Sequence, residues 1–267
     1  MRSLFALPLL LAVGCATAAG VKTDIEKGFL LRSLAVDGVV YPYAVYVPRD
    51  YDPARPWPAV LFLHGAGERG DDGLLQTEVG LPSAIRRHPE RWPAIAVIPQ
   101  APEKRQWAGD AERIALAALE ATEAELRVDP DRVYLTGLSM GGAGAWSLAV
   151  QNPDRFAAVV PICGWIVPTA GREWERDIRA SSFDPADPYG SVARTLRSVP
   201  IWIWHGAEDQ AVPVTESRRM SEALETAGGD TRYSELPHVG HNAWDPAYQS
   251  EELPRWLFAQ KRGPGRR

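Results

Sequence analysis

Apolar residues in this chain gather in short continuous runs, not in strict alternation with polar residues. The runs are Ala59–Leu63, Ile95–Ile98, Val133–Thr136, Ala157–Ile162 and Ile201–Trp204. Runs of this length are typical of parallel strands that are covered on both faces. Stretches with helical spacing lie between or after them, at residues 110–126, 141–151 and 215–227, and a last helix is expected at 251–260. This alternation predicts an α/β fold with a doubly wound, mostly parallel sheet.

The beginning of the chain has a different pattern. Phe29–Val36 and Val39–Val47 are rich in β-branched and aromatic residues, and polar and apolar positions alternate along them. Asp37-Gly38 between them is a strong hairpin signal, and Pro42 indicates an edge position or a bulge. We therefore expect antiparallel strands at the N-terminal side of the sheet.

No repeat, low-complexity stretch or linker divides the chain, so we expect one domain over residues 20–267. One connection, residues 164–199, is longer than usual and contains Trp165, Trp174 and Phe183. A long excursion between two strands is usually functional or mobile. We expect it to lie above the carboxyl ends of the strands as a cap. The alternative is a packed surface excursion without substrate contact.

Residues 1–19 are predicted to be a targeting segment, because one arginine is followed by an apolar run too short to span a membrane. The triplet at 16–18 resembles a signal-peptidase site. Alternatively, residues 12–15 match a bacterial lipobox loosely, with Ala12 in place of the favoured leucine, and Cys15 would then carry a lipid anchor. Under either interpretation the protein is expected to be exported, to the periplasm, the extracellular space or the outer membrane of a bacterium.

Composition and charge narrow the classes of function. The net charge of the 267 residues is −5, and the sequence has no long basic run before its last residues, so we expect no nucleic-acid partner. The 10 tryptophans exceed ordinary usage, and exposed indoles would serve as stacking platforms for carbohydrate or aromatic substrates. Beyond Cys15 the one cysteine is Cys163, which excludes an internal disulfide in the mature chain and is expected to be a buried, inert thiol.

A candidate nucleophile follows the strand at Val133–Thr136. Gly137, Ser139 and Gly141 form a G-x-S-x-G pattern, and small residues then begin a helix. A sharp strand-to-helix turn forces the central serine into strained backbone angles and presents its hydroxyl at the edge of the sheet. The positions two residues away must lack bulk, which explains both glycines. We therefore predict that Ser139 is a nucleophile.

A serine of ordinary pKa needs a base that is oriented by a third group. Folds built on such a turn supply these groups in the chain order Ser, Asp or Glu, His. Asp209 follows the strand at Ile201–Trp204, and Glu208 is the alternative acid. A last strand is predicted at Thr231–Leu236, and His241, which follows it, is the expected base.

The remaining histidines of these segments are given other roles. His205 lies within a strand end and is expected to be structural, and His238 is expected to be a loop residue. A metal site formed by His238 with His241 lacks a third ligand at sensible spacing, so we expect no metal.

Two backbone amides are candidates for an oxyanion hole. One is the N–H of Met140, which follows the nucleophile, and the other lies in the glycine-rich loop after Ala59–Leu63. Ala66 is the first candidate there and Gly67 the second. His64 is expected to brace this loop.

Four segments together carry a resemblance to a known family: LHGAGERGDD (63–72), GLSMGG (137–142), WHGAEDQAVP (204–213) and GHNAW (240–244). The chain resembles secreted esterases of the α/β-hydrolase superfamily over residues 39–262. It is most similar to the phospholipase/carboxylesterase and dienelactone-hydrolase-like group, whose members are often labelled predicted peptidases for their similarity to prolyl oligopeptidase catalytic domains.

The resemblance implies Ser139 as nucleophile, Asp209 as orienter and His241 as base, with no metal or organic cofactor. Dienelactone hydrolases proper use a cysteine, so their activity is not implied. Gln100 and Trp107 match a feature of this group, and with Trp165 they are candidate substrate contacts, although strand-end capping and core packing explain Gln100 and Trp107 equally well.

The function expected from these residues is two-step acyl transfer on a carboxylic ester. The substrate hypothesis is a small-molecule or polysaccharide ester, such as an acetyl or feruloyl group on plant polysaccharide. A serine peptidase acting on short peptides is the first alternative, and a catalytically inactive hydrolase fold that acts as a binding protein is the second.

Overall fold

The structure is a computed structural model that describes residues 25–167 and 183–263. Its strands are β1 (Gly28–Val36), β2 (Val39–Val47), β3 (Trp57–Leu63), β4 (Ile95–Pro99), β5 (Val128–Leu138), β6 (Ala158–Ile162), β7 (Ile201–Gly206) and β8 (Thr231–Leu236). Its α-helices are α1 (Leu81–Arg87), α2 (Asp110–Glu125), α3 (Met140–Gln151), α4 (Pro188–Leu196), α5 (Thr215–Thr226), α6 (Trp244–Gln249) and α7 (Glu252–Ala259). Short 3₁₀ turns are η1 (Ala66–Glu68), η2 (Leu75–Thr77) and η3 (Pro89–Arg91). The predicted targeting segment, Cys15 and Trp174 lie outside the described residues.

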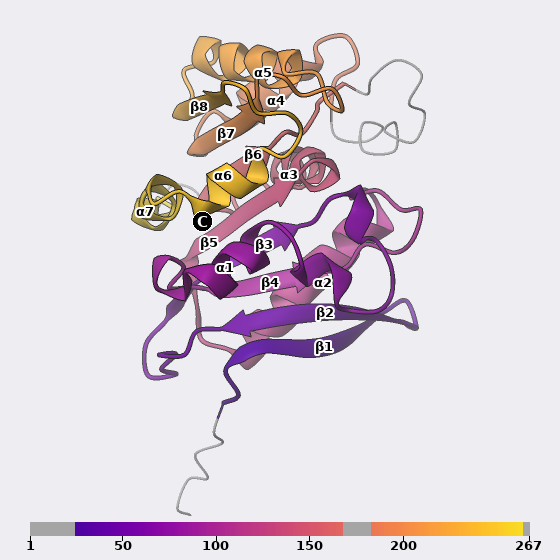
Figure 1. Cartoon of the computed structure of the whole chain (residues 1–267), viewed down its shortest axis with the longest axis vertical. Coiled ribbons are helices and arrows are strands. Elements are labelled where there is room, and N and C mark those ends of the chain that lie inside the picture. Colours follow the sequence, from indigo (N-terminus) through magenta and orange to yellow (C-terminus); the bar gives the residue numbers. More distant parts are fainter. Residues whose placement is uncertain (1–24, 168–182, 264–267) are drawn as a thin grey trace, which may run out of the picture.

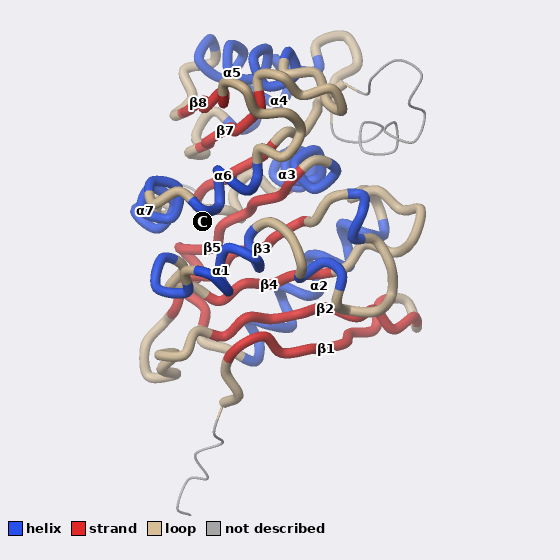
Figure 2. The backbone as a smooth tube through the Cα atoms, in the orientation of Figure 1, coloured by secondary structure: helices blue, strands red, loops and turns tan. Residues whose placement is uncertain are grey.

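The strands form one sheet in the order β1-β2-β4-β3-β5-β6-β7-β8 (Figures 1 and 2). The strands from β4 to β8 in this order run parallel, and β2 joins β4 antiparallel. The antiparallel β1–β2 pair turns at Asp37 and Gly38, both of positive φ, as the hairpin signal predicts. The α/β-hydrolase fold with antiparallel N-terminal strands is therefore confirmed.

Pro42 does not lie on an edge strand, because β2 has a neighbour on each side. It pairs with Ser33 of β1 and precedes Tyr43, where the ladder with β4 begins. A residue without a backbone N–H is thus placed where the strand has one partner only.

Successive side chains of the central strands point into two separate apolar layers. Leu61 and Leu63 of β3 belong to the layer that also contains buried residues of α2, α3, α4 and α5, whereas Val60 and Phe62 belong to the layer that contains those of α1, α6 and α7. This burial on both faces explains why the strands read as continuous apolar runs. Helices α1, α4 and α6 were not predicted.

The long connection between β6 and β7 is in part a covering helix of the sheet. Helix α4 buries Val192, Ala193 and Leu196 in the apolar layer that it shares with α3 and α5. This part of the connection resembles an ordinary crossover. Residues 168–182, where the rest of the predicted cap falls, lie outside the described residues.

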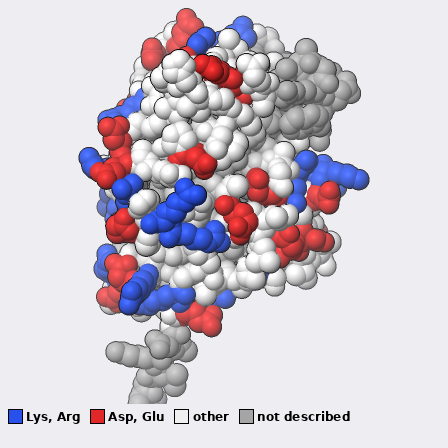
Figure 3. All heavy atoms as spheres, viewed as in Figure 1, with Lys and Arg blue, Asp and Glu red and all other residues white. Residues whose placement is uncertain are grey.

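The surface carries both signs of charge. On the face seen in Figure 3, basic and acidic side chains lie beside one another, with no broad basic area. No helix in residues 25–167 and 183–263 has both the length and the apolar character needed to span a bilayer.

Candidate active site

Ser139 lies at the sharp turn from β5 into α3, with φ 52° and ψ −117°. Such a conformation is strained for a residue with a side chain and is held by its surroundings. A Cβ on Gly137 would overlap the carbonyl of Gly141, and one on Gly141 would overlap the carbonyl of Leu63. Both glycines are therefore required by the close approach of α3 to the strand ends.

The ring of His241 lies between Ser139 and Asp209. Its Nε2 is 2.8 Å from Ser139 Oγ, and its Nδ1 is 2.7 Å from Asp209 Oδ2. A carboxylate accepts, so Nδ1 carries a proton and Nε2 is left to accept from the serine hydroxyl. Three segments more than thirty residues apart thus meet in one hydrogen-bonded chain.

The Asp209 carboxylate is fully buried and receives several donors. Its Oδ1 accepts the amides of Ala211 at 2.7 Å and Val212 at 2.9 Å, and its Oδ2 also faces His205 Nε2 at 3.2 Å. Burial opposes ionisation, but the hydrogen bonds from His205, His241 and the Val212 amide outweigh it, so the pKa of Asp209 lies well below its usual range. Asp209 is therefore an anion at any pH near neutrality.

His205 contributes to the site, although the sequence suggested only a structural place for it. Its Nε2 faces Asp209 Oδ2 and the carbonyl of Val212 at 3.1 Å, and two acceptors require a proton on this nitrogen. Its Nδ1 lies 2.6 Å from Ser217 Oγ on α5. The hydrogen-bonded chain from Ser139 therefore continues through His205 into α5.

Glu208, the alternative acid, points away from this chain. Its carboxylate lies 3.1 Å from His238 Nδ1, and both side chains are well exposed. Asp209, and not Glu208, therefore lies at His241, and His238 is a surface loop residue.

The two amides predicted for an oxyanion hole begin helices. Met140 is the first residue of α3, and Ala66 is the first residue of η1. N–H groups in the first turn of a helix have no partner within it. Ala66 and Ser139 line the same cavity, so the position of both amides is compatible with binding a developing oxyanion.

Gln100 and Trp107 do not line the cavity, which corrects their prediction as substrate contacts. Gln100 accepts from the amide of Gly73 at 2.7 Å and donates to the carbonyl of Glu68 at 3.1 Å. The indole of Trp107 donates to the carbonyl of His64 at 2.9 Å. Both are fully buried and support the loop that carries Ala66.

His64 braces the same loop, as predicted. Its Nε2 accepts from the amide of Ala101 at 2.9 Å, and its Nδ1 lies 2.6 Å from the carbonyl of Gly65, to which it donates. Complete burial lowers the pKa of His64 to about 4. The ring is therefore neutral and serves as a structural link.

A cavity of about 300 Å³ opens at Ser139. It is lined by Gly65, Ala66, Gly67, Glu68, Leu138, Ser139, Trp165, Ala211, Val212, His241 and Trp244. Trp165, one of the predicted substrate contacts, is among them. Trp244 packs edge-on against the His241 ring, with 5.3 Å between ring centroids. Neither Glu68 nor Trp244 was predicted to line this cavity. Both belong to the motifs quoted above, but a motif does not indicate where each of its side chains points.

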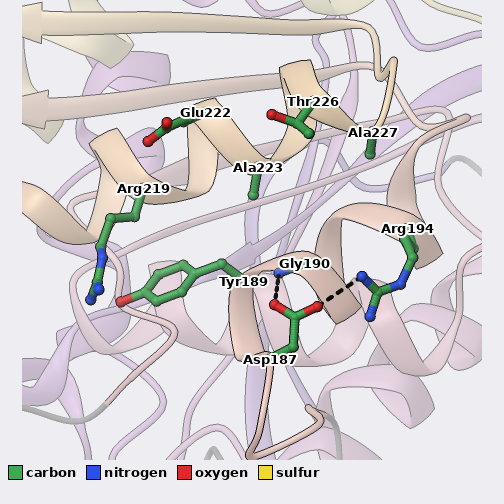
Figure 4. Close-up of a pocket in the computed structure, with 9 residues that line it drawn as sticks. All are labelled: Asp187, Tyr189, Gly190, Arg194, Arg219, Glu222, Ala223, Thr226 and Ala227. Carbon is green, nitrogen blue, oxygen red and sulfur yellow. Dashed lines mark hydrogen bonds and ion pairs between the residues drawn. The ribbon is translucent and has the colours of Figure 1, made fainter.

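A larger groove of about 560 Å³ lies between α4 and α5 (Figure 4). Arg194 is paired with Asp187 at 2.8 Å, and the Arg219 guanidinium lies 5.0 Å from the centre of the Tyr189 ring. The groove shares no lining residue with the cavity at Ser139 and contains no activated nucleophile. The hydrogen-bonded serine, and not cavity size, identifies the candidate site.

One group of potential metal ligands occurs among the described residues: donor atoms of Cys163, Asp209 and His241 lie within 4.8 Å of one another. The Asp209 carboxylate and both nitrogens of His241 already take part in hydrogen bonds. Burial raises the pKa of the Cys163 thiol, which opposes the thiolate that a metal prefers. The arrangement therefore fits proton transfer better than metal binding.

Comparisons with known proteins agree with the fold. A solved thermostable esterase is 31% identical, with a TM-score of 0.74, and the match covers 88% of this chain and 63% of the other. A probable feruloyl esterase C of Aspergillus niger is 30% identical over 132 residues, 47% of this chain and 47% of that protein. A secreted protein of Arthroderma benhamiae is 26% identical over 80% of this chain and 24% of its own length.

These relatives and the eight-stranded sheet place the chain among the α/β-hydrolases. The model of the prolyl oligopeptidase family matches residues 104–260, which is more than half of the chain. The chain belongs to the prolyl oligopeptidase family. The aligned segment spans less than half the length of the two curated relatives named above.

Proposed function

We propose that the protein is a serine hydrolase that cleaves carboxylic esters, with Ser139 as nucleophile, His241 as base and Asp209 as orienter. The observation that carries this proposal is the position of the His241 ring, within hydrogen-bond distance of both other side chains. The esterases among the relatives and the match to a solved esterase support the same class of reaction.

In the proposed mechanism, His241 takes the proton of Ser139 while the oxygen attacks the ester carbonyl. Anionic Asp209 stabilises the imidazolium that forms and holds the ring in place. The amides of Met140 and Ala66 receive the oxyanion. His241 then protonates the leaving alcohol, and water repeats the sequence to release the acid.

The proposed substrates are acetyl or feruloyl esters, including those carried by polysaccharide. The relative in Aspergillus niger is named a feruloyl esterase, and two indoles line the cavity beside Ser139, the partly exposed Trp244 and the buried Trp165. The proposal predicts hydrolysis of p-nitrophenyl acetate and of methyl ferulate.

A peptidase that acts on short peptides is the second candidate, because the family whose model matches is named after an oligopeptidase. The same serine and histidine would serve either substrate, so only a direct comparison separates them. Wild-type protein and Ser139→Ala should be assayed side by side on p-nitrophenyl acetate, methyl ferulate and chromogenic dipeptides. Ester turnover that disappears in Ser139→Ala is expected; cleavage of peptides with both esters untouched would contradict the proposal.

We also propose that residues 1–19 direct export, in line with the relative that is named a secreted protein. Mass spectrometry of the mature N-terminus distinguishes cleavage near residues 18–20 from lipidation of Cys15. An intact Met1 on the protein after expression in an exporting bacterial host would contradict export by either route.

A further inference from the structure

Glu68 brings an acid into the cavity that the proposed mechanism does not use. It ends η1, two residues after Ala66, and lines the cavity at Ser139. Apart from it and His241, the lining residues of this cavity, all within the described part of the chain, have no ionisable acid or base. The opposite walls are apolar, with Leu138, Val212 and two indoles.

One oxygen of this carboxyl group has no hydrogen-bond partner. Glu68 Oε2 is buried and makes no well-formed hydrogen bond, although the backbone amides of Gly65 and Glu68 lie close enough to the carboxyl group to oppose part of the rise in its pKa. His64 Nδ1 lies 4.0 Å away and donates instead to the carbonyl of Gly65, while the Arg69 guanidinium donates to the carbonyl of Ala66 at 2.8 Å. The two nearby side chains that could have paired with Glu68 are thus committed to the backbone of the loop.

Buried polar atoms in folded proteins are almost always hydrogen-bonded, so an orphaned acceptor beside a nucleophile needs an explanation. An active-site acceptor left open in the free protein is one that a substrate group completes. The Glu68 side chain lines the cavity and keeps about a fifth of its surface exposed, so a ligand there can approach it, and a small movement of the side chain brings Oε2 within reach of a hydroxyl group.

The chemistry of the cavity decides between the two common donors, a hydroxyl and an ammonium group. An ammonium would have to lose its water in a cavity with apolar walls, and this desolvation offsets much of the attraction to a carboxylate. A hydroxyl donates without that loss. Burial also raises the pKa of Glu68, and the carboxyl group can accept from a hydroxyl in either protonation state.

We propose that Glu68 accepts a hydrogen bond from a hydroxyl group of the substrate, so that the site selects hydroxylated esters over their hydroxyl-free counterparts. This inference rests on the proposed ester hydrolysis and adds the substrate class. It also predicts that the cavity discriminates against anionic acyl groups, because its one acid is not balanced by a lysine or arginine in the lining.

The test uses pairs of esters that differ by one hydroxyl group, placed on the acyl or the alcohol side. Suitable pairs are methyl cinnamate with methyl 4-hydroxycinnamate, ethyl butyrate with ethyl 3-hydroxybutyrate, and propyl acetate with 3-hydroxypropyl acetate. Ethyl 3-aminobutyrate is the ammonium probe. Wild-type kcat/KM should favour the hydroxylated member of at least one pair by about tenfold, as expected for one hydrogen bond to a charged acceptor.

Three variants locate the preference. In Glu68→Leu the ratio of kcat/KM within that pair should fall to within about twofold of unity, because the acceptor is gone. In Glu68→Gln it should fall severalfold, because a neutral amide is a weaker acceptor. Glu103→Gln removes an exposed carboxylate outside the cavity and should keep the wild-type ratio. Labelling of Ser139 by a fluorophosphonate reports whether each variant is folded. If Glu68→Leu is not folded, the ratio of kcat/KM in the near-isosteric Glu68→Gln decides whether Glu68 carries the preference.

Four outcomes overturn the inference while leaving ester hydrolysis in place: no pair is distinguished by the wild type, the ratio survives in a folded Glu68 variant, Glu103→Gln lowers it as strongly, or the amino ester is preferred to the hydroxy ester. If no ester is turned over and Ser139 is not labelled, the proposed function itself fails and the inference falls with it.

Discussion

The Asp209 carboxylate accepts hydrogen bonds from two histidine rings and two backbone amides and has no exposed surface. Each donor favours the anion and restricts the direction in which Oδ2 points. An orienting group must do both, because the neutral base needs its proton on Nδ1 and the imidazolium needs a nearby negative charge. The surroundings of Asp209 therefore account for its proposed role better than its position in the sequence does.

Replacing Asp209 with asparagine tests this role. The amide can donate to His241 Nδ1 and so favour the wrong tautomer, and we expect kcat to fall by roughly 10³–10⁴-fold. Steady-state kinetics on p-nitrophenyl acetate measure it. Glu208→Gln is the matched control one residue away, and equal losses in the two variants would contradict the assignment.

His205 is expected to act through Asp209 and not on the substrate. In His205→Leu, one donor to Asp209 Oδ2 is lost, so the orientation of the triad loosens. We expect kcat to fall about tenfold, the loss of one hydrogen bond to a charged group, with KM little changed. A variant that is destabilised in urea but retains full kcat would show that the residue is structural only.

At this scale, the sequence predicts residues that belong to recognisable turns and not those that depend on packing. Ser139, Asp209 and His241 each follow a predicted strand within a short motif, and the structure brings them together; their catalytic roles stay a prediction. Glu68 lies in a quoted motif, but nothing in its spacing indicates that it lines the cavity or that one of its oxygens is buried without a well-formed hydrogen bond.

The turn between β5 and α3 joins elements that approach more closely than side chains allow. Gly137 and Gly141 meet each other and the end of β3, and Gly142 faces the end of β6. The first turn of α3 is thereby held against two strand ends. Backbone contact, not side-chain packing, sets the position of Ser139.

Gly141→Ala should therefore be strongly destabilising. The added methyl group would overlap the carbonyl of Leu63, which belongs to a central strand and cannot move freely. We expect the free energy of unfolding to fall by about 2–4 kcal/mol. Urea unfolding measures it, with Gly67→Ala as the control because a Cβ there meets nothing within 4 Å. Similar stabilities for the two variants would contradict the close approach.

The elements that the sequence predicted are those whose apolar residues follow a regular pattern along the chain, either a continuous run or a helical period. The central strands and helices α2, α3 and α5 are of this kind, and their predicted bounds lie within a few residues of the structure. Helices α1, α4 and α6 are short, and each contains a proline within its first three residues. Their formation depends on packing against the sheet, which local periodicity does not report.

Over the whole molecule, the sheet separates two apolar layers, and the site lies where the carboxyl ends of β3, β5 and β7 meet the loops that follow them. His64 links the end of β3 to the residues after β4 through the Ala101 amide. This link connects stability to pH, because it requires a neutral ring. The pKa of His64 is lowered from 6.5 to about 4.

As the pH falls below 6.5, the unfolded chain binds a proton at His64 that the folded protein does not bind. Stability is therefore expected to decrease between pH 6.5 and about pH 4, by up to about 3 kcal/mol from this group. Below that window, protonation of Asp209 removes further stability.

Urea unfolding at pH 7 and pH 5 should show a smaller difference in the free energy of unfolding for His64→Gln than for wild type. His238→Gln, which changes an exposed ring, should behave as wild type, and equal pH dependence in all three proteins would contradict the account.

The central claim is that Ser139 is a nucleophile activated by His241. Treatment of the protein with a fluorophosphonate, followed by peptide mass spectrometry, tests it most directly. We predict one adduct per chain, on Ser139, that is absent in Ser139→Ala and forms far more slowly in His241→Ala. An unlabelled wild-type protein, or an adduct that persists in Ser139→Ala, would contradict it.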